Sequence, residues 1–106
     1  MDILNVNNAG YKNEIEDYNG MVLIDFFSPK CAPCRRMEPV IKSVALDAGK
    51  AVKVCRVNVE TERELVKKFG IMSIPTLVVM KNGEIKNRSI GVTGKKAVMD
   101  MLNLWS

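Results

Sequence analysis

The sequence contains no histidine and only three cysteines, Cys31, Cys34 and Cys55, among its 106 residues. A structural zinc site normally takes four ligands, most often cysteine and histidine. A zinc site that includes Cys31 and Cys34 is therefore disfavoured, because Cys55 is the only other cysteine that could help to complete it. A small, odd number of cysteines also argues against a framework of structural disulfides. The close pair is expected to be reactive.

Long apolar runs and a basic leader are also missing. The longest apolar stretches, such as Met21–Ile24 and Thr76–Met80, are far shorter than the roughly 20 residues that a membrane helix needs. Residues 1–20 lack the basic segment and apolar run of a signal peptide. We therefore expect a cytoplasmic protein that makes no contact with a membrane.

Aromatic residues are scarce, with one tryptophan, two tyrosines and three phenylalanines, although the net charge is +4. A nucleic-acid-binding surface would gather basic residues on one face beside aromatic side chains for stacking. The basic residues here are spread along the chain, so we expect no nucleic-acid partner. The length and the hydrophobic fraction of 47% fit one globular domain, residues 1–106.

Three short apolar runs rich in β-branched and aromatic residues predict strands buried on both faces, at Met21–Phe27, Ala51–Val59 and Thr76–Met80. The dipeptide Asn82-Gly83 suits a two-residue turn, which would join the third strand to another at Ile85–Ile90. Buried strands separated by helical stretches favour a parallel or mixed sheet covered by helices.

Apolar residues at helical spacing predict three helices, over residues 37–48, 65–69 and 98–105. Gly49 and Gly70 are plausible ends for the first two, and Pro39 is expected to kink the first. Trp105 either packs the last helix against the sheet or lies near its frayed end. A short helix capped by Asn7 or Asn8 is expected to run to about Tyr18. The resulting order, β-α-β-α-β-α-β-β-α, predicts an α/β fold with a central mixed sheet flanked by helices.

The segment Cys31-Ala32-Pro33-Cys34 follows a predicted strand and opens a predicted helix. Unpaired backbone N–H groups and the helix dipole favour an anion at a helix N-terminus. A Cys31 thiolate there should have a lowered pKa and act as a nucleophile. The spacing lets the second sulfur reach the first, and Pro33 in the first turn loses no needed hydrogen bond. Lys30, Arg35 and Arg36 add positive charge nearby.

Three segments of the sequence resemble the thioredoxin family. VLIDFFSPKCAPCRRMEP, residues 22–39, is similar to the family's active-site segment. FGIMSIPTLVVMKNGE, residues 69–84, resembles the stretch around its cis-proline, and IGVTG, residues 90–94, resembles its last loop before the final helix. Together with the order of elements, the resemblance covers nearly the whole chain and implies the thioredoxin fold.

The resemblance implies a thiol–disulfide oxidoreductase that reduces disulfides in protein substrates without a metal or organic cofactor. Cys31 would be the attacking thiolate and Cys34 the resolving thiol, and the two would form a Cys31–Cys34 disulfide when oxidised. Asp25 matches the family's buried carboxylate near the second cysteine. The implied partners are a thioredoxin reductase and disulfide-containing proteins, and we expect a monomer that serves electron transport and cell redox homeostasis.

The resemblance also implies a substrate groove. Pro75 matches the cis-proline that faces the disulfide, and Ile74 would offer backbone groups to a bound substrate chain. Two residues depart from the family's commonest pattern, because Lys30 stands in place of tryptophan and Ala32 in place of glycine. The charge of Lys30 is expected to change the choice of partner and leave the dithiol chemistry intact. The predicted substrate-binding residues are Lys30, Ala32, Pro33, Met72, Ile74, Pro75, Gly91 and Val92.

Asp25 is notable without the resemblance, because a carboxylate in a buried strand is costly and is kept for a partner or a function. Simple ion pairing is the alternative to a catalytic role, and both can hold together. Arg56 in the next central strand, where the family usually places lysine, is the expected partner. Since arginine stays charged, it should hold Asp25 more firmly ionised than lysine would. Cys55 is expected to be a small buried hydrophobic residue.

Two rival functions fit parts of the sequence. A disulfide oxidase or isomerase of the same fold would work in an oxidising compartment, but no signal peptide is evident and no histidine lies between the cysteines. A non-catalytic docking module of the same fold would not need both cysteines, Asp25 and Pro75 together. Reduction of protein disulfides is therefore the favoured interpretation.

Overall fold

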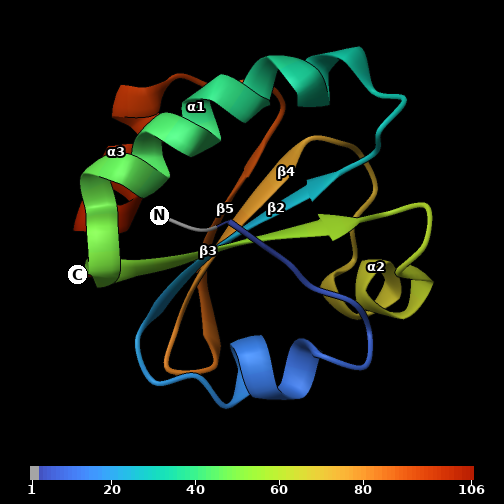
Figure 1. The fold of residues 1–106 in the computed structure, drawn as a ribbon, viewed down its shortest axis with the longest axis horizontal. Helices are drawn as coiled ribbons and strands as arrows, with labels where there is room; N and C mark the ends of the chain where they lie inside the picture. The colour runs from blue at the N-terminus through green and yellow to red at the C-terminus, as the bar shows by residue number, and fades with distance from the viewer. Residues whose placement is uncertain (1–2) are drawn as a thin grey trace.

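The computed structural model describes residues 3–106 and shows a mixed sheet covered by helices on both faces (Figure 1). Short strand β1 and the π-helical turn η1 open the described chain, and three α-helices and four longer strands follow. The bounds in chain order are β1 Leu4–Asn5, η1 Lys12–Glu16, β2 Met21–Phe27, α1 Ala32–Ala48, the 3₁₀ turn η2 Gly49–Ala51, β3 Val52–Asn58, α2 Arg63–Phe69, β4 Thr76–Lys81, β5 Glu84–Ile90 and α3 Lys95–Asn103.

The five strands lie in the order β1-β3-β2-β4-β5. The pairs β1·β3 and β2·β3 are parallel, whereas β2·β4 and β4·β5 are antiparallel. The mixed sheet predicted from the sequence is therefore confirmed, and so is the order of elements, with the π-helical turn η1 in place of the first predicted helix. In this topology the carboxyl end of β2, which leads to Cys31, lies beside the amino end of β4, which follows Pro75, because Phe26 pairs with Thr76.

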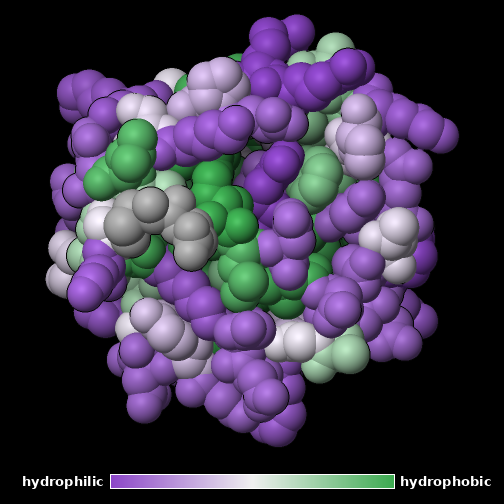
Figure 2. Space-filling view, in the orientation of Figure 1, coloured by the Kyte–Doolittle hydropathy of each residue, from purple (hydrophilic) through white to green (hydrophobic). Residues whose placement is uncertain are grey.

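Two hydrophobic clusters hold the layers together, one on each face of the sheet. One cluster joins the sheet to α1 and α3 through side chains such as Met37, Ile41 and Val98. The other joins the sheet to η1 and α2 through Ile15, Leu65 and Phe69. Burial of these apolar side chains is the main stabilising contribution to the fold. The view in Figure 2 is mostly hydrophilic, with apolar side chains visible where the surface is hollowed near its centre.

The strands and the hairpin lie where the local sequence pattern predicts them. The strand predicted at Met21–Phe27 has these same bounds, and its first six residues are buried. The turn between β4 and β5 consists of Asn82 and Gly83, with φ angles of 52° and 82°. Both angles are positive, as a two-residue hairpin turn of this kind requires. Helices α1 and α2 end at Gly49 and Gly70 as predicted.

The first helix is shorter than predicted. Instead of a helix from Asn7 or Asn8 to Tyr18, the structure has the single π-helical turn η1, closed by a bond from the Asp17 N–H to the Lys12 carbonyl. The Asn7 side chain accepts a hydrogen bond from the Gly10 N–H at 2.7 Å. The Asn8 side chain turns away and accepts one from the Leu65 N–H in the first turn of α2 at 3.2 Å. Asn8 therefore caps a different helix from the one expected.

Helix α1 continues through Pro39, and α3 ends before Trp105. Trp105 lies in the turn after α3, with its side chain partly exposed and its carbonyl accepting a hydrogen bond from Lys81 Nζ at 2.9 Å. The second of the two sequence-based alternatives, a place near the end of the helix, is thus correct. No helix within residues 3–106 combines the length and the apolar character needed to cross a membrane.

Candidate active site

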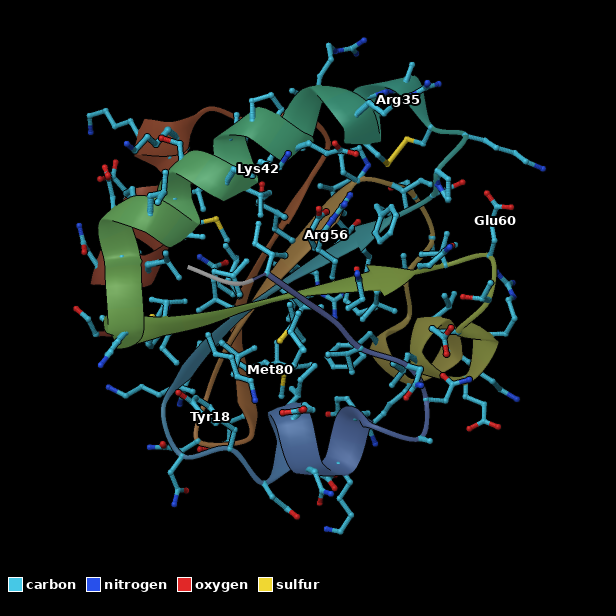
Figure 3. All side chains as sticks on the ribbon, viewed as in Figure 1. Tyr18, Arg35, Lys42, Arg56, Glu60 and Met80 are labelled. Carbon is cyan, nitrogen blue, oxygen red and sulfur yellow. A yellow bond between two sulfur atoms is a disulfide. The ribbon has the colours of Figure 1, made fainter. Side chains whose placement is uncertain are left out.

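Cys31 and Cys34 form a disulfide at the N-terminus of α1, with their Cα atoms 5.2 Å apart (Figure 3). Cys31 is the N-cap residue, and its Sγ accepts a hydrogen bond from the Cys34 backbone N–H at an N–Sγ distance of 3.2 Å. Pro33 occupies the first turn, where a missing N–H breaks no helical bond. Cys34 is buried, whereas Cys31 is partly exposed. The outer sulfur is therefore the more accessible one.

The surroundings of Cys31 favour a negative charge. The first N–H groups of an α-helix have no partner within the helix, and the positive end of the helix dipole lies at the same place. Lys30, Arg35 and Arg36 are exposed on either side of the disulfide. A reduced Cys31 in this position carries the electrostatic setting that stabilises a thiolate.

A small polar network that the sequence did not predict supports the turn before Cys31. The Ser28 carbonyl accepts a hydrogen bond from the Cys31 N–H at 3.1 Å, and the Ser28 hydroxyl accepts one from the Lys30 N–H at 3.1 Å. The Ser28 hydroxyl itself donates to the Glu60 carboxylate. Glu60 Oε1 also lies 3.9 Å from Lys30 Nζ. Glu60, just beyond β3, thus contacts two side chains of this turn, those of Ser28 and Lys30.

Asp25 and Arg56 are directly opposite each other on β2 and β3, so the predicted pair is confirmed. Arg56 Nε donates a hydrogen bond to Asp25 Oδ2 at 3.1 Å. The Asp25 side chain is fully buried, with 0% of its surface exposed. Burial raises the pKa of the Asp25 carboxyl, Arg56 opposes this, and Glu38 on α1 adds to the rise. The net direction is upward, so the arginine does not outweigh the cost of burying the charge.

The second predicted segment contains the expected cis peptide bond, between Ile74 and Pro75. The Pro75 carbonyl accepts a hydrogen bond from the Gly91 N–H at 2.8 Å, which joins the loops at the ends of β4 and β5. The Thr93 N–H in turn lies 3.3 Å from Met37 Sδ in α1. These contacts connect the cis-proline segment and the Gly91 loop to the helix that carries the disulfide. Sequence reasoning did not single out Met37 or Thr93 for this connection.

The other predicted groove residues are partly or fully exposed. Met72 stands out, because 97% of its surface is accessible, and Val92 is also exposed. Lys30 and Ala32 are exposed, whereas Pro33 and Ile74 are half-buried. Met72 and Ile74 line the same surface pocket, and the grouping of all eight residues as a substrate groove stays a prediction.

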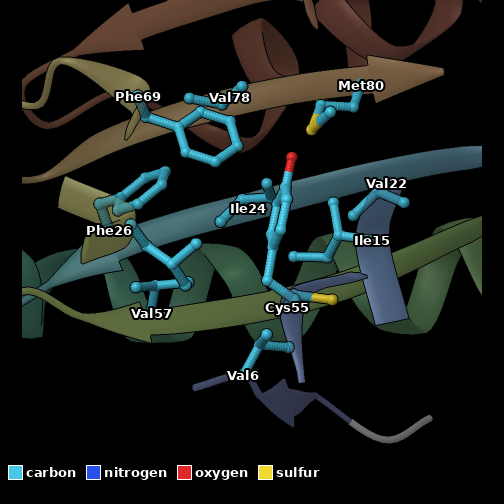
Figure 4. Packing of buried hydrophobic residues seen from close by; sticks show 12 residues of the cluster. Val6, Ile15, Val22, Ile24, Phe26, Cys55, Val57, Phe69, Val78 and Met80 are labelled. Carbon is cyan, nitrogen blue, oxygen red and sulfur yellow. The ribbon is translucent and has the colours of Figure 1, made fainter. Parts of the chain in front are cut away.

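Cys55 lies apart from the disulfide, as a free thiol in the cluster between the sheet and η1 (Figure 4). Its side chain is fully buried among Val6, Ile15 and Ile24. Burial raises the pKa of the Cys55 thiol to about 11, which favours the neutral thiol at physiological pH. The prediction of a small buried hydrophobic residue is confirmed.

In the part of the chain that the structure describes, no group of three or more metal-ligating side chains comes together.

A mixed sheet with a redox-active cysteine pair at the start of a helix, and a cis-proline segment at the same end of the sheet, defines a thiol–disulfide oxidoreductase. Comparison with known proteins agrees with this class. The family model described as Thioredoxin matches residues 2–103. A thioredoxin of Bacillus subtilis is 38% identical over 83% of this chain and 85% of its own. Thioredoxins of Rickettsia bellii and Pyropia yezoensis are 34% and 35% identical, over 93% and 97% of this chain and 94% and 96% of theirs.

The chain belongs to the thioredoxin family. The membership confirms the resemblance found in the sequence, together with the fold and the dithiol–disulfide chemistry that it implied. The family's thiol–disulfide exchange accounts for both features of the pair, an accessible outer sulfur and a buried inner one.

Proposed function

We propose that this protein, acting as one domain over residues 1–106, reduces disulfides in other proteins in the cytoplasm and then receives electrons from a thioredoxin reductase. The observation that carries the proposal is the hydrogen bond from the Cys34 N–H to Cys31 Sγ at the N-terminus of α1. A sulfur held there is stabilised as a thiolate and faces solvent, which are the two requirements for attack on a substrate disulfide.

The reaction begins when the Cys31 thiolate attacks one sulfur of the substrate disulfide. A mixed disulfide forms between Cys31 and the substrate, and the other substrate sulfur leaves as a thiolate. The Asp25 carboxylate then takes the proton of the Cys34 thiol. The Cys34 thiolate attacks Cys31 Sγ, the second substrate sulfur leaves, and the Cys31–Cys34 disulfide remains. The substrate gains two electrons and the protein loses them.

Asp25 suits the role of proton acceptor because its pKa is raised by burial. A general base works best when its pKa approaches the working pH, and an ordinary surface aspartate is too acidic for this. A single hydrogen bond from Arg56 stabilises the buried carboxylate of Asp25. The catalytic group in this proposal therefore consists of Cys31, Cys34 and Asp25, with Arg56 as the charged partner of the acid.

The substrate chain would bind beside the disulfide, against the backbone of Ile74 and Pro75. The hydrogen bond between Gly91 and Pro75 supports this proposal, because it fixes the two loops relative to each other. Met72 and Val92 offer exposed apolar surface for a substrate. Lys30, 87% of whose side chain is exposed, adds a positive charge that favours partners with acidic docking surfaces. The protein would act as a monomer in cellular electron transport and redox homeostasis.

Reduction of insulin by dithiothreitol, followed as turbidity, tests the proposed activity. The wild-type protein should accelerate precipitation of the insulin B chain, and the Cys31→Ser variant should not. Equilibration with mixtures of reduced and oxidised glutathione then separates a reductant from an oxidase, because the disulfide of a reductant is the harder one to reduce. A readily reduced disulfide would favour the oxidase, and a wild-type protein without activity would favour a docking module.

A further inference from the structure

Arg56 lies between two carboxylates of very different exposure. Its Nε atom donates to the buried Asp25, and its Nη2 atom lies 3.8 Å from Oε1 of Glu38, a half-exposed residue of α1. The guanidinium also stacks on Phe27, with 3.7 Å between its central carbon and the ring centroid. The exposed fraction of the three side chains rises from 0% for Asp25 to 17% for Arg56 and 40% for Glu38. Figure 3 shows Arg56 between the sheet and α1.

The pairing between Arg56 and Asp25 is incomplete. A guanidinium can donate two parallel hydrogen bonds to one carboxylate, which is its strongest arrangement. Here Asp25 Oδ1 and Arg56 Nη2 are, within residues 3–106, both buried and without a hydrogen-bond partner. The nitrogen that would complete a two-pronged pair with Asp25 is instead the one that lies near Glu38. Glu38 thus competes with Asp25 for the same cation.

We propose that Glu38 is a positioning residue of the active site, which acts through Arg56 to weaken its hold on Asp25 and so keeps this carboxyl ready to exchange a proton with Cys34. The inference rests on the proposed function, since it assumes that Asp25 serves the resolution of the mixed disulfide. Glu38 itself touches neither substrate nor sulfur in this account. Its contribution is electrostatic and is made mainly through the shared guanidinium, with a smaller direct effect of its own charge.

Few charges act on the Asp25 carboxyl, so the effect of Glu38 can be isolated. Arg56 approaches it from β3 and Glu38 acts from α1. On its other side, β4 places the uncharged Leu77 opposite it. In the reduced protein, the Cys34 thiol is one more titratable group on α1. Arg56 favours the ionised acid, and Glu38 opposes ionisation by its own charge and by its claim on Arg56.

The test is the pH dependence of the resolution step in a Glu38→Gln variant. The reduced protein reacts with Ellman's reagent to give a mixed disulfide on Cys31, and release of the second thionitrobenzoate reports attack by Cys34. In the wild type the rate should rise with pH as Asp25 ionises. In Glu38→Gln, Arg56 is free to bind Asp25 more tightly, and the rise should move to lower pH by roughly half a unit.

Asp47→Asn is the matched control, because Asp47 lies on the same helix and its removal changes the net charge by the same amount. Asp47 pairs with Lys95 and does not act on Asp25. Its profile should coincide with that of the wild type. A Glu38→Gln profile that also coincides with the wild type, or that shifts only as much as the Asp47→Asn profile, would overturn the proposal.

Two further variants separate the possible failures. If Glu38 acts mainly through Arg56, then Glu38→Gln should produce a much smaller shift in an Arg56→Met background. An undiminished shift there would show that only the direct charge of Glu38 matters and would overturn the proposal. Asp25→Asn should abolish the pH-dependent rise. If that rise persists without Asp25, the proposed role of Asp25 fails. If it disappears but Glu38→Gln has no effect, the inference about Glu38 alone is wrong.

Discussion

The Cys31 sulfur accepts a hydrogen bond from the backbone N–H of Cys34, with 3.2 Å between the two atoms. The bond turns the first cysteine into the cap of the helix that the second cysteine occupies. A neutral thiol is a weak acceptor, whereas a thiolate is a strong one, so the geometry supports the ionised form of Cys31. Cys34, with 1% of its surface exposed, has no comparable access to reagents.

The three thiols should therefore react with an alkylating reagent in a fixed order. At neutral pH, iodoacetamide should label Cys31 of the reduced protein first and Cys34 more slowly. Cys55 should stay unlabelled until the protein unfolds, because it is buried and burial raises its thiol pKa to about 11. Peptide mass spectrometry over time measures the order, and early labelling of Cys34 or Cys55 would contradict it.

The buried Asp25 should change how the free energy of unfolding depends on pH. Because the folded-state pKa of Asp25 is raised above its unfolded value, the protonated acid favours folding at low pH. This contribution is complete below the unfolded pKa, near 4, and is lost as pH rises through the folded pKa. Each unit of difference between the two pKa values corresponds to about 1.4 kcal/mol.

Asp25→Asn removes this titration, so its free energy of unfolding minus that of the wild type should increase from about pH 4 toward neutral pH. Asparagine keeps an acceptor oxygen for Arg56 Nε, and any difference in this hydrogen bond changes the stability of the variant by a nearly constant amount. The slope is therefore the diagnostic quantity. Urea unfolding at several pH values measures it, and a difference that stays flat or decreases would show that burial does not raise this pKa.

Gly91 is expected to matter for substrate binding because of its backbone. Its φ angle is 92°, a conformation that residues with a side chain rarely adopt, and no atom lies within 4 Å of an added Cβ. Gly91→Ala should therefore shift the loop, weaken the bond to Pro75 and cost about 1 kcal/mol of stability. We expect a several-fold higher KM for insulin with little change in the reaction with Ellman's reagent.

Gly94→Ala provides the control for this prediction, since Gly94 has a φ of −87° and open space around an added Cβ. Its KM for insulin should equal that of the wild type, although alanine is a poorer N-cap residue than glycine for α3. Equal effects of the two substitutions on the KM for insulin would mean that the backbone of Gly91 has no special part in binding.

Lys30 should influence the choice of partner through its charge. Its ion pair with Glu60 is long and exposed, so removing it should change stability by less than about 1 kcal/mol. Rates with an acidic disulfide peptide should fall as salt increases, and Lys30→Gln should weaken that dependence. Lys96→Gln, an exposed lysine on α3 paired with Asp100, is the control. A salt dependence equal in all three proteins would leave Lys30 without a role in recognition.

Local sequence patterns predicted the parts of the fold that local chemistry determines. Met21–Phe27 forms the predicted strand because its apolar run can be buried on both faces, and Asn82-Gly83 forms the turn because both residues tolerate a positive φ. The first helix was predicted too long. Asn8 is an effective cap, but its side chain accepts a hydrogen bond from the N–H of Leu65 in α2, which is distant in sequence.

The candidate site, too, could be predicted only in part from the sequence. The Cys31–Cys34 pair and the partnership of Asp25 with Arg56 could be predicted, because each follows from a motif or from the cost of a buried charge. Glu38 and Glu60 could not, since each acts across elements through a single side chain, one on Arg56 and the other on Ser28 and Lys30. A carboxylate four residues after Cys34 on the same helix is a weak signal that becomes informative only beside Arg56.

The central claim, that Cys31 attacks substrates and Cys34 releases them, is tested most directly by trapping the intermediate. A Cys34→Ser variant mixed with a disulfide-containing protein should accumulate a mixed disulfide, because the resolving thiol is absent. Mass spectrometry should locate the substrate on Cys31, and a Cys31→Ser variant treated identically should trap almost none. Accumulation on Cys34 in Cys31→Ser, with little on Cys31 in Cys34→Ser, would contradict the account.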